Sequence, residues 1–192
     1  LQDADAHPQL IGDYKPVDQW QAHINQLFYR FRGDQIRKFY QTFASADYRL
    51  GHALAADYFE KVTAREKAQT KPPAPQPDLT VVELGPCNAN MAACFLSHLK
   101  TLDRNGLVYS RVQYVLVDWE QAVLDTAMSH PGLAGHRDRL QPLRSTVDHL
   151  VNLPDGSVDR IFCNELWNDL PTKLLSRHGG EIEEEFLRPN LS

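Results

Sequence analysis

The sequence has few cysteines, no long apolar run and no excess of basic residues, and each of these shortages excludes a class of protein. Its three cysteines, Cys87, Cys94 and Cys163, form no CxxC or Cys/His pattern, which argues against a disulfide framework and a metal site. No stretch approaches the ~18 apolar residues that a membrane span needs. The net charge of −5 offers no basic face for nucleic acid.

The N-terminal segment lacks the features of a targeting signal. Its sequence, LQDADAHPQL, is polar and acidic, without the basic start and apolar core of a signal peptide. Together with the sparse cysteines, this predicts a cytoplasmic protein that binds neither membranes nor nucleic acid and holds no metal. Hydrophobic residues make up 42% of the chain, which is enough for a packed core.

Residues 1–69 have the pattern of a helical N-terminal subdomain. From Asp18, the expected N-cap, apolar residues recur on one helical face until Gly33 ends the pattern. Two more helical stretches follow, with apolar residues between 36 and 43 and between 50 and 62. Residues 70–77, TKPPAPQP, contain four prolines and predict an extended linker. We therefore expect a domain boundary there.

Residues 78–192 alternate between short apolar runs and helical patterns. Strands are expected at residues 79–84, 112–117, 139–143 and 158–163, and helices at residues 90–102 and 120–128. Residues 172–175 could begin a further strand. Such alternation is typical of parallel sheets. The predicted fold class is α/β, with a Rossmann-like, mostly parallel sheet and flanking helices, preceded by the helical subdomain.

The most informative segment is TVVELGPCNANMAACFL, residues 80–96. A buried strand ends in Glu83-Leu84-Gly85, and a short loop leads from it into a helix. Glycine at such a turn lets a ligand approach the backbone, and the N-terminus of the helix attracts anionic groups. The alternative interpretation is an ordinary strand-to-helix connection that binds nothing.

A carboxylate ends the second expected strand, in YVLVDWEQA, residues 114–122. Asp118 can accept hydrogen bonds from both ribose hydroxyls of a nucleotide-like cofactor, and Trp119 offers a flat apolar surface for adenine. Alternatively, Asp118 caps the following helix, and the two roles are compatible. A nicotinamide site is disfavoured, because GxGxxG is missing and Asp118 lies beyond the usual spacing of ~20 residues.

ELG and LVD, at the ends of these two strands, resemble motifs I and II of class I methyltransferases that depend on S-adenosylmethionine. In that family the acidic residue of motif I lies near the methionine part of the cofactor, and motif II binds the ribose. The resemblance implies S-adenosylmethionine as the cofactor here. The residues that would hold it are Glu83, Gly85, Cys87, Asn88, Asn90, Asp118 and Trp119.

A third segment, IFCNELWNDLPTKL at residues 161–174, resembles the NE…D…LP signature of the family that includes the mitochondrial complex I assembly methyltransferase and its bacterial relatives. That family is associated with methylating protein arginine. By this likeness, a methyl acceptor would meet the cofactor at Asn164, Glu165 and Asp169, with Asn168 beside them. Carboxylates can hold a guanidinium through charge-assisted hydrogen bonds. The alternative is a helix-capping cluster.

Two departures from the family keep a second function open. The family's loop repeats glycine at alternate positions, whereas here Gly85 is followed by Cys87 and Ala89. A side chain there could crowd the methionine end, and a positive φ would cost about 1 kcal/mol or more. The alternative function is therefore a catalytically degenerate binding or assembly protein. Residues 78–192 also offer fewer strands than the family's sheet. The rest of a larger protein, or another chain as in a homo-oligomer, would complete the sheet of this chain.

Overall fold

The computed structural model describes residues 9–32, 42–70, 75–150 and 152–191. The chain divides into two compact units. The sheet unit comprises Gln41–Leu166, and the terminal unit combines Leu1–Tyr40 with Trp167–Ser192. The two ends of the chain therefore belong to the same unit, although they are far apart in the sequence.

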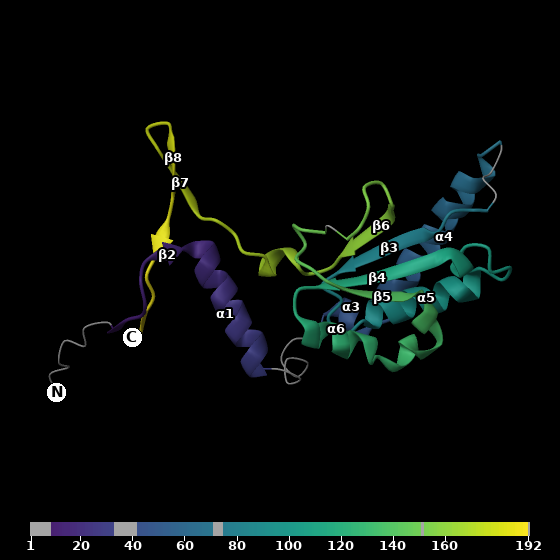
Figure 1. Ribbon diagram of the computed structural model, residues 1–192, viewed down its shortest axis with the longest axis horizontal. Coiled ribbons are helices and arrows are strands. Elements are labelled where there is room, and N and C mark those ends of the chain that lie inside the picture. The colour runs from purple at the N-terminus through teal and green to yellow at the C-terminus, as the bar shows by residue number, and fades with distance from the viewer. Residues whose placement is uncertain (1–8, 33–41, 71–74, 151, 192) are drawn as a thin grey trace. The chain divides into compact units, whose positions relative to one another are not determined.

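A four-stranded parallel sheet forms the centre of the sheet unit (Figure 1). Its strands are β3 (Leu79–Leu84), β4 (Val112–Asp118), β5 (Leu140–Arg144) and β6 (Val158–Cys163), in the order β5-β4-β3-β6. β3 and β6 have the limits expected from the sequence, β4 extends to Asp118, and β5 is shifted by a single residue. The predicted α/β, Rossmann-like class is confirmed for this unit.

The strand order of the sheet reverses at β3. From β3 the chain adds β4 and then β5 on one side, and it returns to place β6 on the other side. In open α/β sheets, ligands bind outside the carboxyl ends of the strands at such a reversal. A ligand site is therefore expected at the turns that follow β3 and β6.

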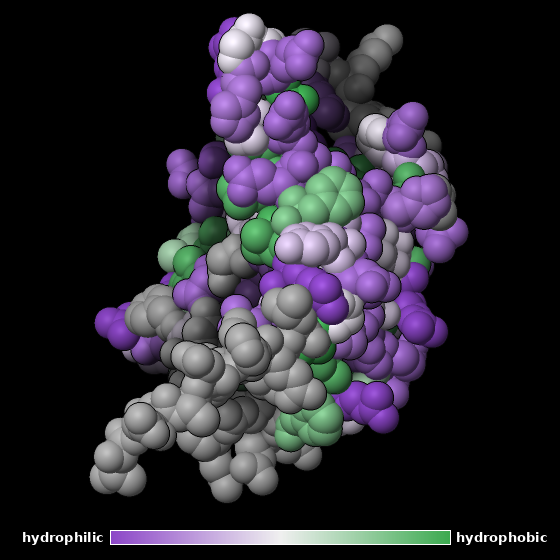
Figure 2. Space-filling model, turned by 90° about the vertical axis from the view of Figure 1, so that its left-hand side faces the viewer, coloured by the Kyte–Doolittle hydropathy of each residue, from purple (hydrophilic) through white to green (hydrophobic). Residues whose placement is uncertain are grey.

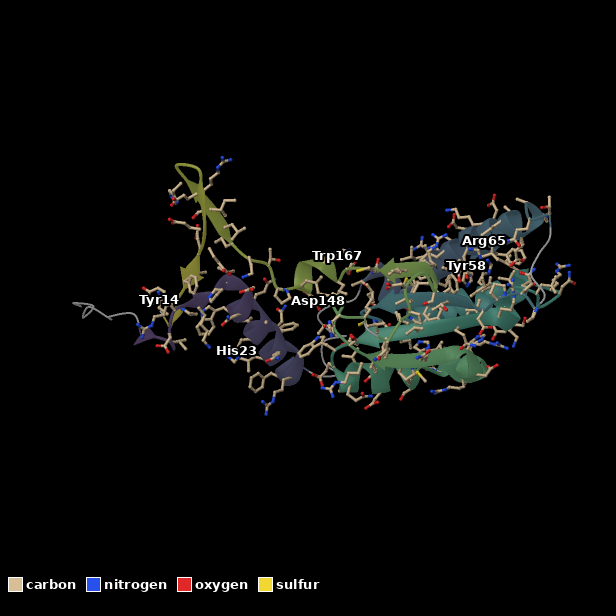
Figure 3. The ribbon with its side chains drawn as sticks, turned by 45° about the horizontal axis from the view of Figure 1, so that its top comes forward. Tyr14, His23, Tyr58, Arg65, Asp148 and Trp167 are labelled. Carbon is tan, nitrogen blue, oxygen red and sulfur yellow. The ribbon has the colours of Figure 1, made fainter. Side chains whose placement is uncertain are left out.

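Helices cover one face of the sheet. α4 (Arg49–Lys67), α5 (Asn90–Leu102) and α6 (Gln121–Met128) contribute buried residues to a core cluster on that face. At its centre is Phe95, whose ring lies 5.7, 5.5 and 5.4 Å from the rings of Tyr58, Tyr114 and Phe162. Tyr58 comes from α4, as Figure 3 shows. Two 3₁₀ helices, η2 (Tyr109–Arg111) and η3 (Pro131–Arg139), complete the described helical elements of this unit after α5.

A smaller cluster covers the opposite face of the sheet. Val82 and Leu84 of β3 pack there with residues of β4 and β5, and partly buried side chains between Val147 and Leu166 lie against them. β3 is therefore covered on both faces, which explains its nearly continuous apolar sequence. Glu83 is the charged residue of this strand, and Thr80 is its other polar residue.

The terminal unit is built around α1 (Val17–Arg32), which ends before Gly33 as expected but begins at Val17, so that Asp18 lies in its first turn and is not the expected N-cap. Short antiparallel pairs join β1 (Gln9–Leu10) to β10 (Asn190–Leu191), β2 (Lys15–Pro16) to β9 (Phe186–Leu187), and β7 (Leu175–His178) to β8 (Glu181–Glu184). The indole of Trp20 donates to the carbonyl of Leu187 at 2.9 Å. Phe31 of α1 is 78% exposed. The face in Figure 2 mixes hydrophobic with hydrophilic side chains.

The helical N-terminal subdomain expected at residues 1–69 is not confirmed. α3 (Phe43–Ala46) and α4 belong to the sheet unit, because α4 buries Ala55 and Val62 in the core beneath the sheet. α1 belongs instead with the strands at the C-terminal end of the chain. The two compact units thus meet along the chain at residues 40–41 and 166–167 rather than at residues 70–77. Independent folding of residues 1–69 and 78–192 stays a prediction.

The strand expected to begin within residues 172–175 is confirmed only in part. A strand does begin at Leu175, but it forms the β7–β8 hairpin rather than extending the parallel sheet. Of the helical stretch expected at residues 36–43, residues 36–41 lie outside the described part of the chain. None of the described helices has the length and apolar character needed to cross a membrane.

Candidate functional site

The turn after β3 depends on Gly85. Its φ of 67° is in the left-handed region, and its N–H donates to the carbonyl of Val117 at 2.9 Å. A Cβ at this position would lie 3.1 Å from Cδ1 of Leu166, which follows β6. The backbone therefore comes close to the segment after β6 at the reversal of strand order, and only glycine adopts this conformation without strain.

The loop beyond Gly85 keeps a left-handed conformation at alternate positions. Cys87 has a φ of 51° and Ala89 a φ of 57°. These are the two positions at which the sequence lacks the expected glycines, so the backbone has the conformation that glycine would favour. Each non-glycine residue costs about 1–2 kcal/mol there. Strain of this kind persists only where the surroundings fix it, and it is concentrated at functional sites.

Replacing Cys87 with Gly should stabilise the protein. Cys87 is exposed, so little packing is lost, and relief of the left-handed strain should exceed the entropy that glycine adds to the unfolded chain. We expect the free energy of unfolding to rise by roughly 0.5–1 kcal/mol in urea titrations. Cys87→Ala is the matched control, since it removes the thiol and keeps the strain. Equal stability of the Gly and Ala variants would contradict the argument.

Gly85→Ala should weaken cofactor binding and stability together. Gly106 is the matched control, because its φ is 68° and a Cβ added there would have no atom within 4 Å. Both Ala variants should lose about 1 kcal/mol of stability through strain. Only Gly85→Ala should also lose about tenfold or more in affinity for S-adenosyl-homocysteine, as measured by calorimetry. Equal affinities of the two variants would remove Gly85 from the site.

Asn88 and Asn90 anchor the loop to the segment around α3. The amide of Asn88 donates to the carbonyl of Ser45 at 2.8 Å, and that of Asn90 donates to the carbonyls of Ala44 and Asp47 at 2.9 and 3.0 Å. These amide donors are thus used within the protein. Their expected contact with a cofactor stays a prediction, while their anchoring role was not anticipated from the sequence.

The loop leads directly into α5, whose first residue is Asn90. Ala89 occupies the N-cap position and provides no side-chain hydrogen bond, and the first turn contains no acidic residue. The first N–H of this 13-residue helix, that of Asn90, donates to Oδ1 of Asn88 at 3.1 Å, so the helix offers a ligand its positive dipole end and the other N–H groups of its first turn. Such an end favours an anionic group of a ligand.

Asp118 ends β4 next to this loop. One of its carboxylate oxygens accepts from the N–H of Glu120 at 2.9 Å. Glu120 is itself the N-cap of α6, so Asp118 bonds the turn before the helix rather than capping its first turn. Its backbone carbonyl accepts from the N–H of Ser145 at 3.0 Å, which joins the ends of β4 and β5. Burial raises the pKa of Asp118 to about 6, although the hydrogen bond from Glu120 opposes this shift. Trp119 beside it is 42% exposed.

Glu83 lies inside the core cluster rather than in an open crevice. It is only 4% exposed, and the Tyr114 hydroxyl donates to its Oε2 at 2.8 Å. Burial raises the pKa of Glu83 to about 8, and the hydrogen bond from Tyr114 offsets only part of the shift. This role of Tyr114 was not anticipated from the sequence. The sign of this role in the sequence was Tyr114 itself, a hydroxyl-bearing residue at an inward position of the mostly apolar strand β4.

The structure brings only some of the expected acceptor residues together. Asn164 and Glu165 directly follow β6, and Glu165 is exposed with a φ of 54°, another left-handed residue beside the reversal. Asp169 belongs to the terminal unit, in the 3₁₀ helix η4 (Trp167–Asp169), where its carbonyl accepts from Asn25 at 2.9 Å. Its grouping with Glu165 therefore stays a prediction. The side chain of Asn168 lies outside the described part of the chain.

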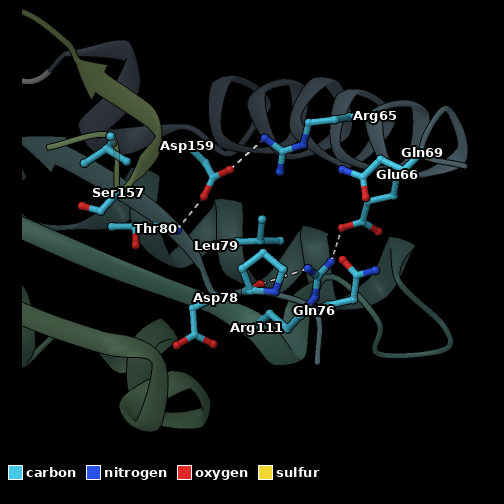
Figure 4. Close-up of a pocket in the computed structure, with 13 residues that line it drawn as sticks. Arg65, Glu66, Gln69, Gln76, Asp78, Leu79, Thr80, Arg111, Ser157 and Asp159 are labelled. Atoms are coloured by element: carbon cyan, nitrogen blue, oxygen red, sulfur yellow. Dashed lines mark hydrogen bonds and ion pairs between the residues drawn. The ribbon is translucent and has the colours of Figure 1, made fainter. Parts of the chain in front are cut away.

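A groove of about 640 Å³ lies at the other end of the strands, where β3 and β6 begin (Figure 4). Four of the five charged side chains that line it are paired with one another. Arg65 contacts Asp159 at 2.9 Å, Asp159 also accepts from the N–H of Thr80, and Arg111 contacts Glu66 at 2.5 Å. These pairs account for four of the groove's charges within the fold itself, and Asp78 is the fifth charged residue. We therefore do not assign the cofactor to this groove.

The described residues contain no cluster of three or more side chains suited to bind a metal. The candidate site consists of three segments: the loop 85–90, the end of β4 at Asp118, and the residues after β6. All three belong to the sheet unit and lie at the carboxyl ends of its strands.

Solved structures with a similar fold exist. A COG1565 superfamily member from Burkholderia thailandensis, a presumed methyltransferase crystallised with S-adenosyl-homocysteine, matches with a TM-score of 0.58 and 16% identity over 93% of this chain. A native structure of an uncharacterised COG1565 superfamily protein from the same organism has a TM-score of 0.48 and 17% identity over 93% of this chain.

This chain covers 46% and 44% of those two proteins, and thus spans about half of their length. No family model matches the sequence, and neither does any curated protein. At 16% identity, the likeness to the first structure shows that the fold is shared.

Proposed function

We propose that this chain is the cofactor-binding part of a methyltransferase that uses S-adenosylmethionine. The observation that carries the proposal is the alternate left-handed backbone at Gly85, Cys87 and Ala89, next to Asp118 at the reversal of strand order. A protein retains such strain where the conformation itself is needed. The similar fold of a presumed methyltransferase crystallised with S-adenosyl-homocysteine supports the same cofactor class.

The residues present suit this cofactor. A Cβ at Gly85 would lie 3.1 Å from Leu166, so glycine allows the turn after β3 to pack closely against the segment after β6. The Asp118 carboxylate would accept from the ribose hydroxyls, and the exposed ring of Trp119 would lie against adenine. The start of α5, where Asn88 occupies only the N–H of Asn90, would attract the carboxylate of the methionine part. When bound, the cofactor supplies a methyl group activated by its sulfonium.

The acceptor is proposed to be a nitrogen of a protein, such as the guanidinium of arginine. Transfer to nitrogen is a direct displacement, so the protein contributes mainly alignment and electrostatic support of the acceptor. Glu165 is the best candidate to hold a cationic guanidinium, since it is exposed beside the reversal. Asn164 and Asp169 are proposed as further contacts of the acceptor.

Glu165→Gln should lower methyl transfer about tenfold and leave cofactor affinity within about twofold, because charge-assisted bonds are about twice as strong as neutral ones. The measurement is transfer of a labelled methyl group to an arginine-rich protein, with calorimetry of cofactor binding in parallel. Glu181→Gln, an exposed carboxylate on β8, is the control variant. Equal turnover of the parent and Glu165→Gln would reject the guanidinium role.

A second candidate function rests on the two side chains in the loop. Cys87 and Ala89 occupy positions where glycine would leave more room, which favours a binding or assembly protein without turnover. Titration of the protein with S-adenosylmethionine and S-adenosyl-homocysteine, followed by the transfer assay, separates the candidates. Binding with transfer supports the enzyme, and binding without transfer to any protein supports the second candidate. A folded protein that binds neither ligand would reject both cofactor-based proposals.

A further inference from the structure

The carboxyl group of Glu83 is buried without a positive partner. It projects from β3 to the side that α4 and α5 cover, and Tyr114 is its hydrogen-bond donor among the described residues. β6 and α5 contribute Phe162 and Phe95 to the same cluster, and α4 contributes Tyr58, whose hydroxyl is uncharged at neutral pH and whose pKa burial raises further. None of the described Lys, Arg or His side chains forms an ion pair with Glu83.

Burying an ionised carboxylate without a cation is costly, so the group keeps its proton instead. The pKa of about 8 expresses this cost. Glu83 therefore carries a proton in most molecules of the free protein at neutral pH. At neutral pH, removing that proton from most molecules requires a new positive charge nearby, and no described side chain forms an ion pair with Glu83.

The position of Glu83 indicates where such a charge could arrive. Glu83 precedes Leu84 and Gly85, so its backbone leads directly into the loop at the carboxyl edge of the sheet. S-adenosylmethionine carries a sulfonium and an ammonium group against one carboxylate, and is therefore a net cation at neutral pH. S-adenosyl-homocysteine lacks the sulfonium charge. A cation near a low-dielectric carboxyl group favours its ionised form.

We propose that Glu83 exchanges its proton with cofactor binding, holding it in the free protein and releasing it to the solvent as the cationic cofactor binds. The inference rests on the proposed cofactor site and deepens it. Glu83 then acts through its charge from within the core. The released proton passes to the buffer, and the ionised carboxylate balances the positive charge of the cofactor. The site would thereby distinguish the methyl donor from its neutral product.

Calorimetric titration in two buffers with different heats of ionisation counts the protons released on binding. At pH 7 we expect the parent protein to release at least half a proton more per S-adenosylmethionine than Glu83→Gln does. The cofactor's own amino group also titrates near pH 8, but it contributes equally to both proteins and cancels in the difference. S-adenosyl-homocysteine should release less than half as many protons from the parent as the cationic cofactor.

Tyr114→Phe is a second variant that keeps the acid. Loss of the hydroxyl removes the bond that favours ionised Glu83, so the pH midpoint of proton release should move upward. Equal proton release by the parent and Glu83→Gln, with S-adenosylmethionine bound to both, would overturn the inference and leave the cofactor site intact. Absence of binding by the folded parent protein at every pH would instead reject the cofactor site, and the inference with it.

Discussion

Glu83→Gln should be more stable than the parent protein above pH 8, while the two proteins should have similar stability near pH 4. The folded-state pKa of Glu83 is raised to about 8, against a normal value of 4.5. The parent's Glu83 therefore contributes its full stability below pH 4.5. That contribution is lost as the pH rises, because the unfolded state ionises first while the folded state retains the proton until about pH 8. The difference should reach several kcal/mol.

Urea unfolding at intervals between pH 4 and pH 9 measures this difference. The raised pKa of Asp118, about 6, affects both proteins equally and cancels between them. Glu60→Gln, which removes an exposed carboxylate from α4, is the control and should follow the parent curve closely. Parallel curves for the parent and Glu83→Gln across the whole range would show that Glu83 ionises freely, and would also remove the basis for proton exchange.

Asp118→Ala should weaken the binding of S-adenosyl-homocysteine by about 1–3 kcal/mol, or roughly 5- to 150-fold. The physical reason is that the ribose hydroxyls would be left without their acceptor in a partly enclosed site. Calorimetric titration at pH 7.5 gives the affinity directly. At that pH the parent carboxyl group is ionised, since its pKa is about 6.

Asp125→Ala is the matched control for this measurement. Asp125 is exposed on the neighbouring helix α6, where its carboxylate accepts from Gln121 at 2.9 Å. Its replacement removes an acidic group from the same region without touching the end of β4. Unchanged affinity in a folded Asp118→Ala variant would eliminate the ribose role and leave Asp118 only its bond to Glu120.

The parallel sheet could be predicted closely because its signals are local. Strand β3 is a short, mostly apolar run, β6 has apolar residues at Val158 and at 161–163, and α5 has apolar residues at helical spacing from Asn90 onward. These patterns follow from burial on one or both faces of an element. Gly85 and Asp118 could then be placed at the carboxyl ends of β3 and β4, because the apolar runs of these strands end beside them.

Two strand pairs of the terminal unit, β1–β10 and β2–β9, could not be predicted, because they join distant segments through two-residue strands. Nothing in Lys15–Pro16 or Phe186–Leu187 alone specifies that they pair. The same limit applies to the side-chain contacts of the site. The bond between Glu83 and Tyr114 depends on the register of β3 and β4, and the amides of Asn88 and Asn90 bond to carbonyls far back in the sequence.

Hydrogen–deuterium exchange with and without S-adenosyl-homocysteine tests the location of the cofactor most directly. The proposed site predicts slower exchange of backbone N–H groups at residues 85–92 and 118–120. It also predicts no change at residues 156–159, which line the groove at the other end of the strands. Slower exchange at that groove, or unchanged exchange at residues 85–92 and 118–120 under saturating ligand, would contradict the assignment.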